Sequence, residues 1–163
     1  MDLNPTLAKA YANRGNVNAR LGQYNETFAD YDKAIHLSPK FAEIRYSRGI
    51  AKMIFSQYDA AITDFNNAIH LNPNYIDAYY NRGAAKGILK QHEAAITDFD
   101  EVIRIDPDYV DAYYNRGNAK YALGRCEEAK SDSQIALELS EQQGKEDLKA
   151  DVEQLLQELN KEK

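Results

Sequence analysis

The chain has 163 residues, 44% of them hydrophobic, so it is long enough and apolar enough to bury a core and is not a disordered chain. Its 26 acidic and 20 basic residues give a formal net charge of −6, which argues against nucleic acid and against an anionic membrane as partners, because both require a basic face. A single cysteine excludes an internal disulfide, and no apolar run approaches the roughly 18 residues of a membrane-spanning helix, so we expect a cytoplasmic protein.

A repeat of 34 residues runs through almost the whole chain. An Arg-Gly pair recurs at this interval, with its glycines at Gly15, Gly49, Gly83 and Gly117, and prolines recur with the same period at Pro5, Pro39, Pro73 and Pro107. The segment DAYYNRG occurs unchanged at 77–83 and 111–117. Self-similarity at a period of about 20–50 residues is the signature of repeat architectures such as solenoids.

In chain order, the repeat divides the sequence into six parts. Residues 1–7 match the end of a unit, because Leu3-Asn4-Pro5 parallels Leu71-Asn72-Pro73, so we expect them to be the tail of a truncated preceding repeat. Four units follow at 8–41, 42–75, 76–109 and 110–143, and a last segment occupies 144–163.

The third unit shows the pattern of two helices. An apolar and aromatic stretch runs from Ile76 to about Leu89, and a second periodic stretch runs from Glu93 to Ile105. The apolar positions of the second stretch fall on one helical face, at Ala95, Ile96, Phe99, Val102 and Ile103. Pro107 then ends the helix, because proline cannot continue the hydrogen-bond ladder. We therefore predict a helix-turn-helix in each unit.

The glycine of each first helix predicts a close approach between paired helices. Glycine costs about 1 kcal/mol in a helix interior, so its recurrence indicates that a side chain would not fit. Small residues recur on the second helices at Thr27, Ala61, Ala95 and Ala129, and we expect the bulky residues Tyr31, Phe65 and Phe99 to fill the space between the helices.

The arginines that precede these glycines predict a ladder of ion pairs. Asp30, Asp64, Asp98 and Asp132 follow Arg14, Arg48, Arg82 and Arg116 by sixteen residues, on the second helix of each unit. An arginine on an interhelical face requires a carboxylate partner. We therefore expect structural pairs between the helices, with recognition of an acidic ligand as the alternative.

The fourth unit and the segment after it predict the end of the array. Lys130 and Ser133 stand where the third unit has Ile96 and Phe99. Beyond Gly144, apolar residues share one helical face opposite glutamates and lysines, at Leu148, Val152, Leu155, Leu156 and Leu159. A polar-backed helix that covers the last apolar flank is typical of repeat arrays, so we expect a capping helix. A partner helix of a coiled coil is the alternative, although two heptads are too few for one.

The period, the aromatic residue four positions before the glycine, the small residue on the second helix and the closing proline resemble the tetratricopeptide repeat. The sequence departs from that family in the arginine before each glycine and in Arg45, which replaces the aromatic residue. The resemblance implies an all-α fold, a right-handed α-solenoid of four helix-turn-helix units plus a C-terminal capping helix, with the first helices lining a concave surface. The RNA-binding pentatricopeptide family has a repeat of similar length but lacks this glycine and alanine pattern.

No group of residues predicts catalysis. His36 and His70 stand one repeat apart, too far to share a metal, and His92 and Cys126 occupy a position where earlier units have tyrosine. We expect both to serve packing, with a reactive thiol at Cys126 as the alternative. The sequence has no phosphate-binding glycine loop and no nucleophile motif. We therefore expect no enzyme activity, no cofactor and no metal site.

The face of the first helices opposite the glycines predicts a peptide-binding groove, in which tyrosines and asparagines lie over a small apolar centre. The groove residues are Asn13, Asn16, Tyr46, Ile50, Tyr80, Asn81, Tyr114, Asn115, Asn118 and Tyr121, with an acidic rim of Glu43, Asp77 and Asp111. Asparagine pairs with a peptide backbone as donor and acceptor, and tyrosine is enriched at binding hot spots. The alternative is that part of each ladder serves helix packing.

The carboxylate clamp of chaperone-binding family members does not carry over to this chain. The clamp positions hold Ala12, Asn16, Ser47, Asp77 and Asn81, of which only Asn16 fits. Asp77 would repel a ligand carboxylate, so a neutral or basic segment is favoured.

The sequence thus predicts a non-catalytic protein-protein interaction module, an adaptor or scaffold that holds an extended peptide or partner segment in its concave groove. The alternative is a self-assembling structural repeat that forms a homo-oligomer through its uncapped N-terminal helix.

Overall fold

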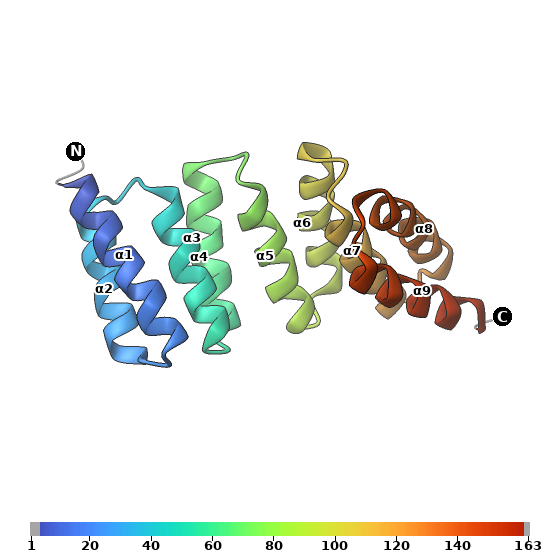
Figure 1. The fold of residues 1–163 in the computed structure, drawn as a ribbon, viewed down its shortest axis with the longest axis horizontal. Helices are drawn as coiled ribbons and strands as arrows, with labels where there is room; N and C mark the ends of the chain where they lie inside the picture. Colours follow the sequence, from blue (N-terminus) through green and yellow to red (C-terminus); the bar gives the residue numbers. More distant parts are fainter. Residues whose placement is uncertain (1–3, 162–163) are drawn as a thin grey trace. The chain divides into compact units, whose positions relative to one another are not determined.

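The computed structural model of the chain describes residues 4–161, and every regular element in that range is an α-helix. In chain order the helices are α1 (Pro5–Arg20), α2 (Tyr24–Leu37), α3 (Ala42–Ile54), α4 (Tyr58–Leu71), α5 (Ile76–Ile88), α6 (His92–Ile105), α7 (Val110–Ala122), α8 (Cys126–Gln143) and α9 (Glu146–Lys161) (Figure 1). None of the helices within this range combines the length and the apolar character needed to cross a membrane. The chain forms two compact units with a boundary inside α5, so that unit 1 ends at Ala85 and unit 2 begins at Lys86.

The helix boundaries follow the repeat. The second helix of the third repeat, α6, begins one residue before the predicted start at Glu93 and ends at Ile105, just before the Asp-Pro pair. Helix α1 begins at Pro5, where the side chain of Asn4 accepts a hydrogen bond from the backbone nitrogen of Leu7 at 3.0 Å. Of the predicted tail at 1–7, residues 1–3 lie outside the described range, and residues 5–7 form the first turn of α1.

Consecutive helices pack as hairpins. Within unit 1, α1 packs against α2 and α3 against α4, and α3 also contacts both helices of the first hairpin. Within unit 2, α7 packs against α8 and contacts α6, while α9 packs against α8 and contacts α7. Helix α9 therefore stands where the first helix of a further hairpin would stand. This repetition of helical hairpins is the predicted all-α helical repeat fold.

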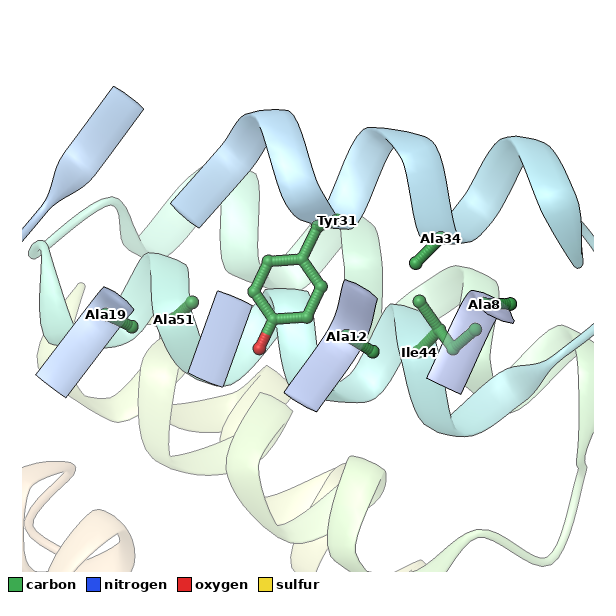
Figure 2. Close-up of a cluster of buried hydrophobic side chains, with 7 residues drawn as sticks. All are labelled: Ala8, Ala12, Ala19, Tyr31, Ala34, Ile44 and Ala51. Carbon is green, nitrogen blue, oxygen red and sulfur yellow. The ribbon is translucent and has the colours of Figure 1, made fainter. Parts of the chain in front are cut away.

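Small residues and one large aromatic residue form the core of the first hairpin. Tyr31 is fully buried and points from α2 towards α1, in a cluster with Ala8, Ala12 and Ala19 on α1, Ala34 on α2, and Ile44 and Ala51 on α3 (Figure 2). A Cβ atom at Gly15 would lie 3.1 Å from Cε2 of Tyr31, and one at Gly49 would lie 2.6 Å from Cε1 of Phe65. The close approach predicted at the glycines is therefore confirmed at both hairpins of unit 1.

The last hairpin has a serine in place of the aromatic residue. A Cβ atom at Gly117 would lie 3.3 Å from Oγ of Ser133, which is itself buried and donates a hydrogen bond to the carbonyl oxygen of Ala129 at 2.8 Å. Helix α9 supplies apolar bulk beside this hairpin through three buried side chains, Val152, Leu155 and Leu159. The face predicted for the capping helix is thus the buried face of α9.

Arginine and aspartate side chains join the two helices of a hairpin. Nε and Nη2 of Arg48 donate to the two carboxylate oxygens of Asp64 at 2.8 and 2.6 Å. The same two-point contact joins Arg14 to Asp30 at 2.7 and 2.6 Å, and Arg116 to Asp132 at 2.9 and 2.6 Å. The predicted ladder is confirmed for these three pairs. The fourth pair would join Arg82 of unit 1 to Asp98 of unit 2 and stays a prediction.

A second donor, four residues after the arginine, completes the pairing of each aspartate. Nζ of Lys52 lies 2.7 Å from Asp64, whose side chain is only 1% exposed. Lys86 binds Asp98 at 2.8 Å, Lys120 binds Asp132 at 2.7 Å, and in the first hairpin Nδ2 of Asn18 donates to Asp30 at 3.2 Å. Burial of an ionised carboxylate is costly unless it is fully paired. The hydrogen bond from Arg14 accordingly lowers the pKa of Asp30 below its ordinary value, against the opposing effect of burial.

The remaining guanidinium nitrogen, Nη1, reaches the preceding hairpin. It donates from Arg48 to Asp32 on α2 at 2.8 Å, from Arg82 to Asn66 on α4 at 2.6 Å, and from Arg116 to Asp100 on α6 at 2.5 Å. Arg48 and Arg116 thus fix their own hairpin through Nε and Nη2 and the previous second helix through Nη1.

We expect Gly49→Ala to lower the free energy of unfolding by about 1–3 kcal/mol, because the added methyl group would overlap the buried ring of Phe65. Gly117→Ala is the matched control. A Cβ atom at Gly117 meets Ser133 Oγ at 3.3 Å and no atom closer, and the gain of about 1 kcal/mol in helix propensity is common to both substitutions, so the control should lose less stability. Urea denaturation followed by circular dichroism measures both, and equal effects of the two substitutions would contradict the close approach at Gly49.

We also expect Arg48→Met to lower the free energy of unfolding by about 2–3 kcal/mol, because it leaves the buried carboxylate of Asp64 with Lys52 as its remaining cation. Arg104→Met is the control, since Arg104 pairs with Glu101 on the surface and the loss there should stay below about 0.5 kcal/mol. The same denaturation experiment separates the two, and a small effect of Arg48→Met would show that the buried pair is dispensable.

Candidate functional site

A hollow of about 240 Å³ lies between the first helices of unit 1, on the face predicted to bind a partner. It is lined by Lys9, Ala12, Asn13 and Asn16 of α1, by Phe41 at the start of α3, and by Glu43, Ile44 and Ser47 of α3. We call it the α1/α3 hollow. Two of the predicted asparagines and one predicted rim acid therefore lie in one depression.

Buried contacts orient the polar groups of the α1/α3 hollow. The hydroxyl of Tyr31 donates to Oδ1 of Asn16, so the amide nitrogen of Asn16 is the end of that side chain left for a ligand. The ammonium group of Lys9 lies 5.0 Å from the centre of the Phe41 ring, which places a cation opposite the carboxylate of Glu43 on α3. The lining thus offers amide and ammonium donors from α1 and an acceptor from α3. The charges of Lys9 and Glu43 are opposite, so the lining has no net formal charge.

Unit 2 has a hollow at the equivalent place, between α7 and α9. It measures about 340 Å³ and is lined by Tyr114 and Asn118 of α7 and by Asp151, Gln154, Leu155 and Glu158 of α9. Tyr114 and Asn118 are the residues that follow Ala12 and Asn16 by three repeats. The α7/α9 hollow therefore uses the same face of a first helix, but its two carboxylates give it a negative lining.

Tyr46 and Asn81, predicted as separate groove residues, are partners within unit 1. Nδ2 of Asn81 donates to the hydroxyl of Tyr46 at 3.2 Å and to the backbone oxygen of Asp77 at 2.8 Å. The Tyr46 ring packs 5.0 Å from the ring of Tyr75 and 5.9 Å from that of Phe65. Burial, followed by the charge of Asp77, raises the pKa of Tyr46. Both residues therefore have a packing role as well as a place on the predicted face.

The other predicted residues are distributed over the two units. In unit 1, Ile50 and Tyr80 are half-buried and Asp77 is exposed. In unit 2, Nδ2 of Asn115 donates to the backbone oxygen of Asp111 at 2.9 Å, and Tyr121 packs against the cluster of Ala129, Leu155 and Leu159. The carboxylate of Asp111 binds Lys145 at 2.9 Å, which neutralises this part of the predicted acidic rim.

Sequence reasoning missed three kinds of residue that line the hollows or contact the predicted acidic rim. Lys9 lies one helical turn before Asn13 and could have been found from that spacing. The polar residues of α9, namely Asp151, Gln154 and Glu158, lie at intervals of three and four residues away from its leucines, and treating α9 as the first helix of another hairpin would have placed them on this face. No comparable signal marks Lys145, which stands in the connection between α8 and α9.

The single thiol group of the chain, at Cys126, lies outside these hollows. Cys126 is half-buried against the cluster of Ala129, Leu155 and Leu159, as a packing residue would be. Among residues 4–161, no group of three histidine, cysteine or carboxylate side chains is arranged to hold a metal ion. The arrangement can therefore donate and accept hydrogen bonds and present aromatic surface to a ligand.

Hairpins of paired helices at a period of 34 residues, with a polar face on the first helices, define a helical repeat protein of the solenoid class. Tetratricopeptide repeat models match residues 8–41 and 110–143, and a model described as TPR repeat matches residues 56–87 and 88–124. The chain belongs to the tetratricopeptide repeat family, whose fold is that of a protein-protein interaction module.

Solved structures support this assignment. MamA is 30% identical to the chain, with a TM-score of 0.80 over 87% of this chain and 83% of MamA. The tetratricopeptide domain of Arabidopsis OM64 is 30% identical, with a TM-score of 0.69 over 75% of this chain and 96% of that domain. The first such domain of Spaghetti (RPAP3), solved with the HSP90 peptide SRMEEVD, is 27% identical, with a TM-score of 0.71 over 76% and 98% of the two chains. No curated protein matches the chain.

We expect the stability of the protein to fall above about pH 10, because burial raises the pKa of Tyr31, Tyr46 and Tyr75 above the ordinary phenol value. These phenols stay protonated in the folded chain while those of the unfolded chain ionise. Their contribution is therefore complete below about pH 10 and is lost as the pH rises, at up to about 1.4 kcal/mol per pH unit for each group. Urea denaturation between pH 9 and 11 measures the slope. Tyr75→Phe should reduce this slope by up to about 1.4 kcal/mol per pH unit. An unchanged slope would contradict the raised pKa of Tyr75.

Proposed function

We propose that the chain is a non-catalytic adaptor that holds an extended segment of a partner protein against the first helices of its hairpins. The observation that carries the proposal is the pair of hollows at equivalent places in the repeat, α1/α3 and α7/α9. Each hollow suits an extended segment, because its lining combines hydrogen-bonding side chains with apolar ones. A cytoplasmic location belongs to the same proposal and rests on the single cysteine.

The lining of the two hollows suits a peptide backbone. Asn16 is held with its amide nitrogen available as a donor, and Asn118 donates to the backbone oxygen of Tyr114 at 3.2 Å, which leaves its own Oδ1 suited to accept from a ligand. Ser47 adds a hydroxyl to the α1/α3 hollow. Hydrogen bonds of this kind are independent of the side chains of the ligand, and apolar contact with Ile44 or Leu155 would add affinity.

The charges favour a neutral or basic partner segment. The α1/α3 hollow carries Lys9 against Glu43, whereas the α7/α9 hollow carries Asp151 and Glu158. Net charge of −6 on the whole chain acts in the same direction by drawing basic segments towards the protein. An acidic peptide would meet like charges in unit 2, which weakens its binding.

The proposal is tested by selecting peptides of 15 residues on the full chain and measuring their affinity by fluorescence anisotropy. We expect dissociation constants of order micromolar, or about −8 kcal/mol. Asn13→Trp and Gln154→Trp should fill the α1/α3 and α7/α9 hollows from exposed positions, and the double variant should weaken the selected peptides at least tenfold. Ala10→Trp and Gln157→Trp, at exposed positions of the same two helices that do not line the hollows, are the matched controls. Equal affinities in the double variant and the controls would exclude the hollows as the site.

The acidic peptide SRMEEVD tests the charge preference separately. We expect it to bind at least tenfold more weakly than a selected peptide rich in lysine or arginine, and raising the salt concentration should narrow that gap. Tight binding of SRMEEVD would contradict the preference for neutral or basic segments while leaving the position of the site open to the first test.

A further inference from the structure

Arg14 differs from the equivalent arginines in one respect. It binds Asp30 through Nε and Nη2, but within residues 4–161 no acceptor lies on its Nη1. The corresponding Nη1 atoms of Arg48, Arg82 and Arg116 donate to Asp32, Asn66 and Asp100 on a preceding second helix. The side chain of Arg14 is consequently 61% exposed, against 17% for Arg48 and 16% for Arg116.

Apolar surface accompanies this exposed guanidinium group. Leu7 is 43% exposed, and the centre of the Tyr11 ring lies 5.4 Å from the guanidinium carbon of Arg14 and 5.4 Å from the ammonium nitrogen of Lys33. A hollow of about 360 Å³ beside them is lined by Leu7, Tyr11, Asp32, Lys33, His36 and Leu37. We call the surface formed by Leu7, Tyr11 and Arg14 the α1 flank.

Helix α7 presents the same surface and shows what covers it. Tyr113 and Arg116 have the geometry of Tyr11 and Arg14, with the guanidinium carbon again 5.4 Å from the ring centre. Helix α6 covers this pair through two residues, because Asp100 accepts from Arg116 and Ile103 packs against the cluster that contains Tyr113. The partner of the α7 surface is thus an α-helix with an aspartate and, three residues later, an isoleucine.

A side-chain acceptor and, three residues later, an isoleucine recur on every second helix that precedes one of these arginines. The pairs are Asp32 with Ile35, Asn66 with Ile69, and Asp100 with Ile103. In unit 1, Asp32 accepts from Arg48 and Ile35 packs against the cluster that contains Ile44 of α3. The spacing of three places both residues on one helical face, so a single helix can satisfy the arginine and cover the apolar surface together.

We infer that the α1 flank is a docking site for a helix of another protein that carries aspartate or asparagine followed three residues later by isoleucine or a similar apolar residue. Its acceptor would occupy Nη1 of Arg14, and its apolar residue would cover Leu7 and Tyr11. A charge-assisted hydrogen bond from Arg14 Nη1 favours aspartate over asparagine. This surface is separate from the α1/α3 and α7/α9 hollows, and the inference does not rest on the proposed function.

A peptide with the sequence of residues 91–109 of this chain is a suitable probe, because it contains Asp100 and Ile103 in the arrangement that covers α7. Isolated helices of this length are marginal in water, so Ala94→Lys joined to Asp98 by a lactam bridge keeps the peptide helical. Both bridged positions lie on the side of the helix opposite Asp100 and Ile103. Fluorescence anisotropy with the full-length protein measures the affinity.

We expect saturable binding of this peptide. Asp100→Ala in the peptide should weaken binding at least tenfold and Asp100→Asn less than threefold, while Glu101→Ala, at the next position, should have no effect. In the protein, Leu7→Asp should abolish binding without unfolding α1, because an acidic residue is favourable in the first turn of a helix. Asn13→Trp, which fills the α1/α3 hollow, should leave the binding of this peptide unchanged and so separates the two sites.

Three results would overturn the inference. The first is that the bridged peptide fails to bind at millimolar concentration. The second is binding that is insensitive to Leu7→Asp or to Asp100→Ala, which would place the peptide elsewhere. The third is a dimer in light scattering that Leu7→Asp dissociates, because the occupant of the flank would then be a second copy of this chain.

Discussion

A buried carboxylate on the second helix of a hairpin is the constraint around which the rest of the structure is arranged. Asp64 is almost inaccessible to water, and an ionised group in that position is tolerable only when cations surround it. Arg48 and Lys52 meet this requirement from one face of α3, so that face must turn towards α4. Because Nη1 of the same arginine also binds α2, one charged group sets the pairing of two helices and the stacking of the next hairpin.

Because one face of each first helix packs against the second helix of its hairpin, only its other faces can contact a partner. The glycine and the arginine of a first helix face its partner helix, so the residues on the opposite side are left to line the α1/α3 and α7/α9 hollows. Those residues vary between repeats more than the glycine and the arginine do, since Asn16, Ile50, Ala84 and Asn118 share one position in the repeat. The invariant chemistry of the hairpin thus supports a surface whose chemistry changes from unit to unit.

The period made the fold predictable, because most packing residues of one hairpin recur in the next. The spacing of sixteen residues identified the partners of Arg48 and Arg116, and the glycines identified the close approaches to Tyr31 and Phe65. The site was less accessible to such reasoning. The contact between Asn81 and Tyr46 joins two different repeats, and the pairing of Asp111 with Lys145 involves a connection that occurs once in the chain. A repeat pattern shows which residues are equivalent in successive repeats but not which of them touch across repeats, so these contacts could not be predicted from it.

Asn66 shows that the joint between hairpins does not depend on the sign of its acceptor. It receives the hydrogen bond of Arg82 at 2.6 Å, as Asp32 and Asp100 receive those of their arginines. Asparagine and aspartate have nearly the same shape, so an exchange at this position alters the charge of the array by one unit while the spacing of the hairpins is preserved. During evolution, the net charge of the array can therefore change while the helix packing stays the same. Substitution at this position therefore changes which partner charges the protein attracts and leaves the packing of its hairpins intact.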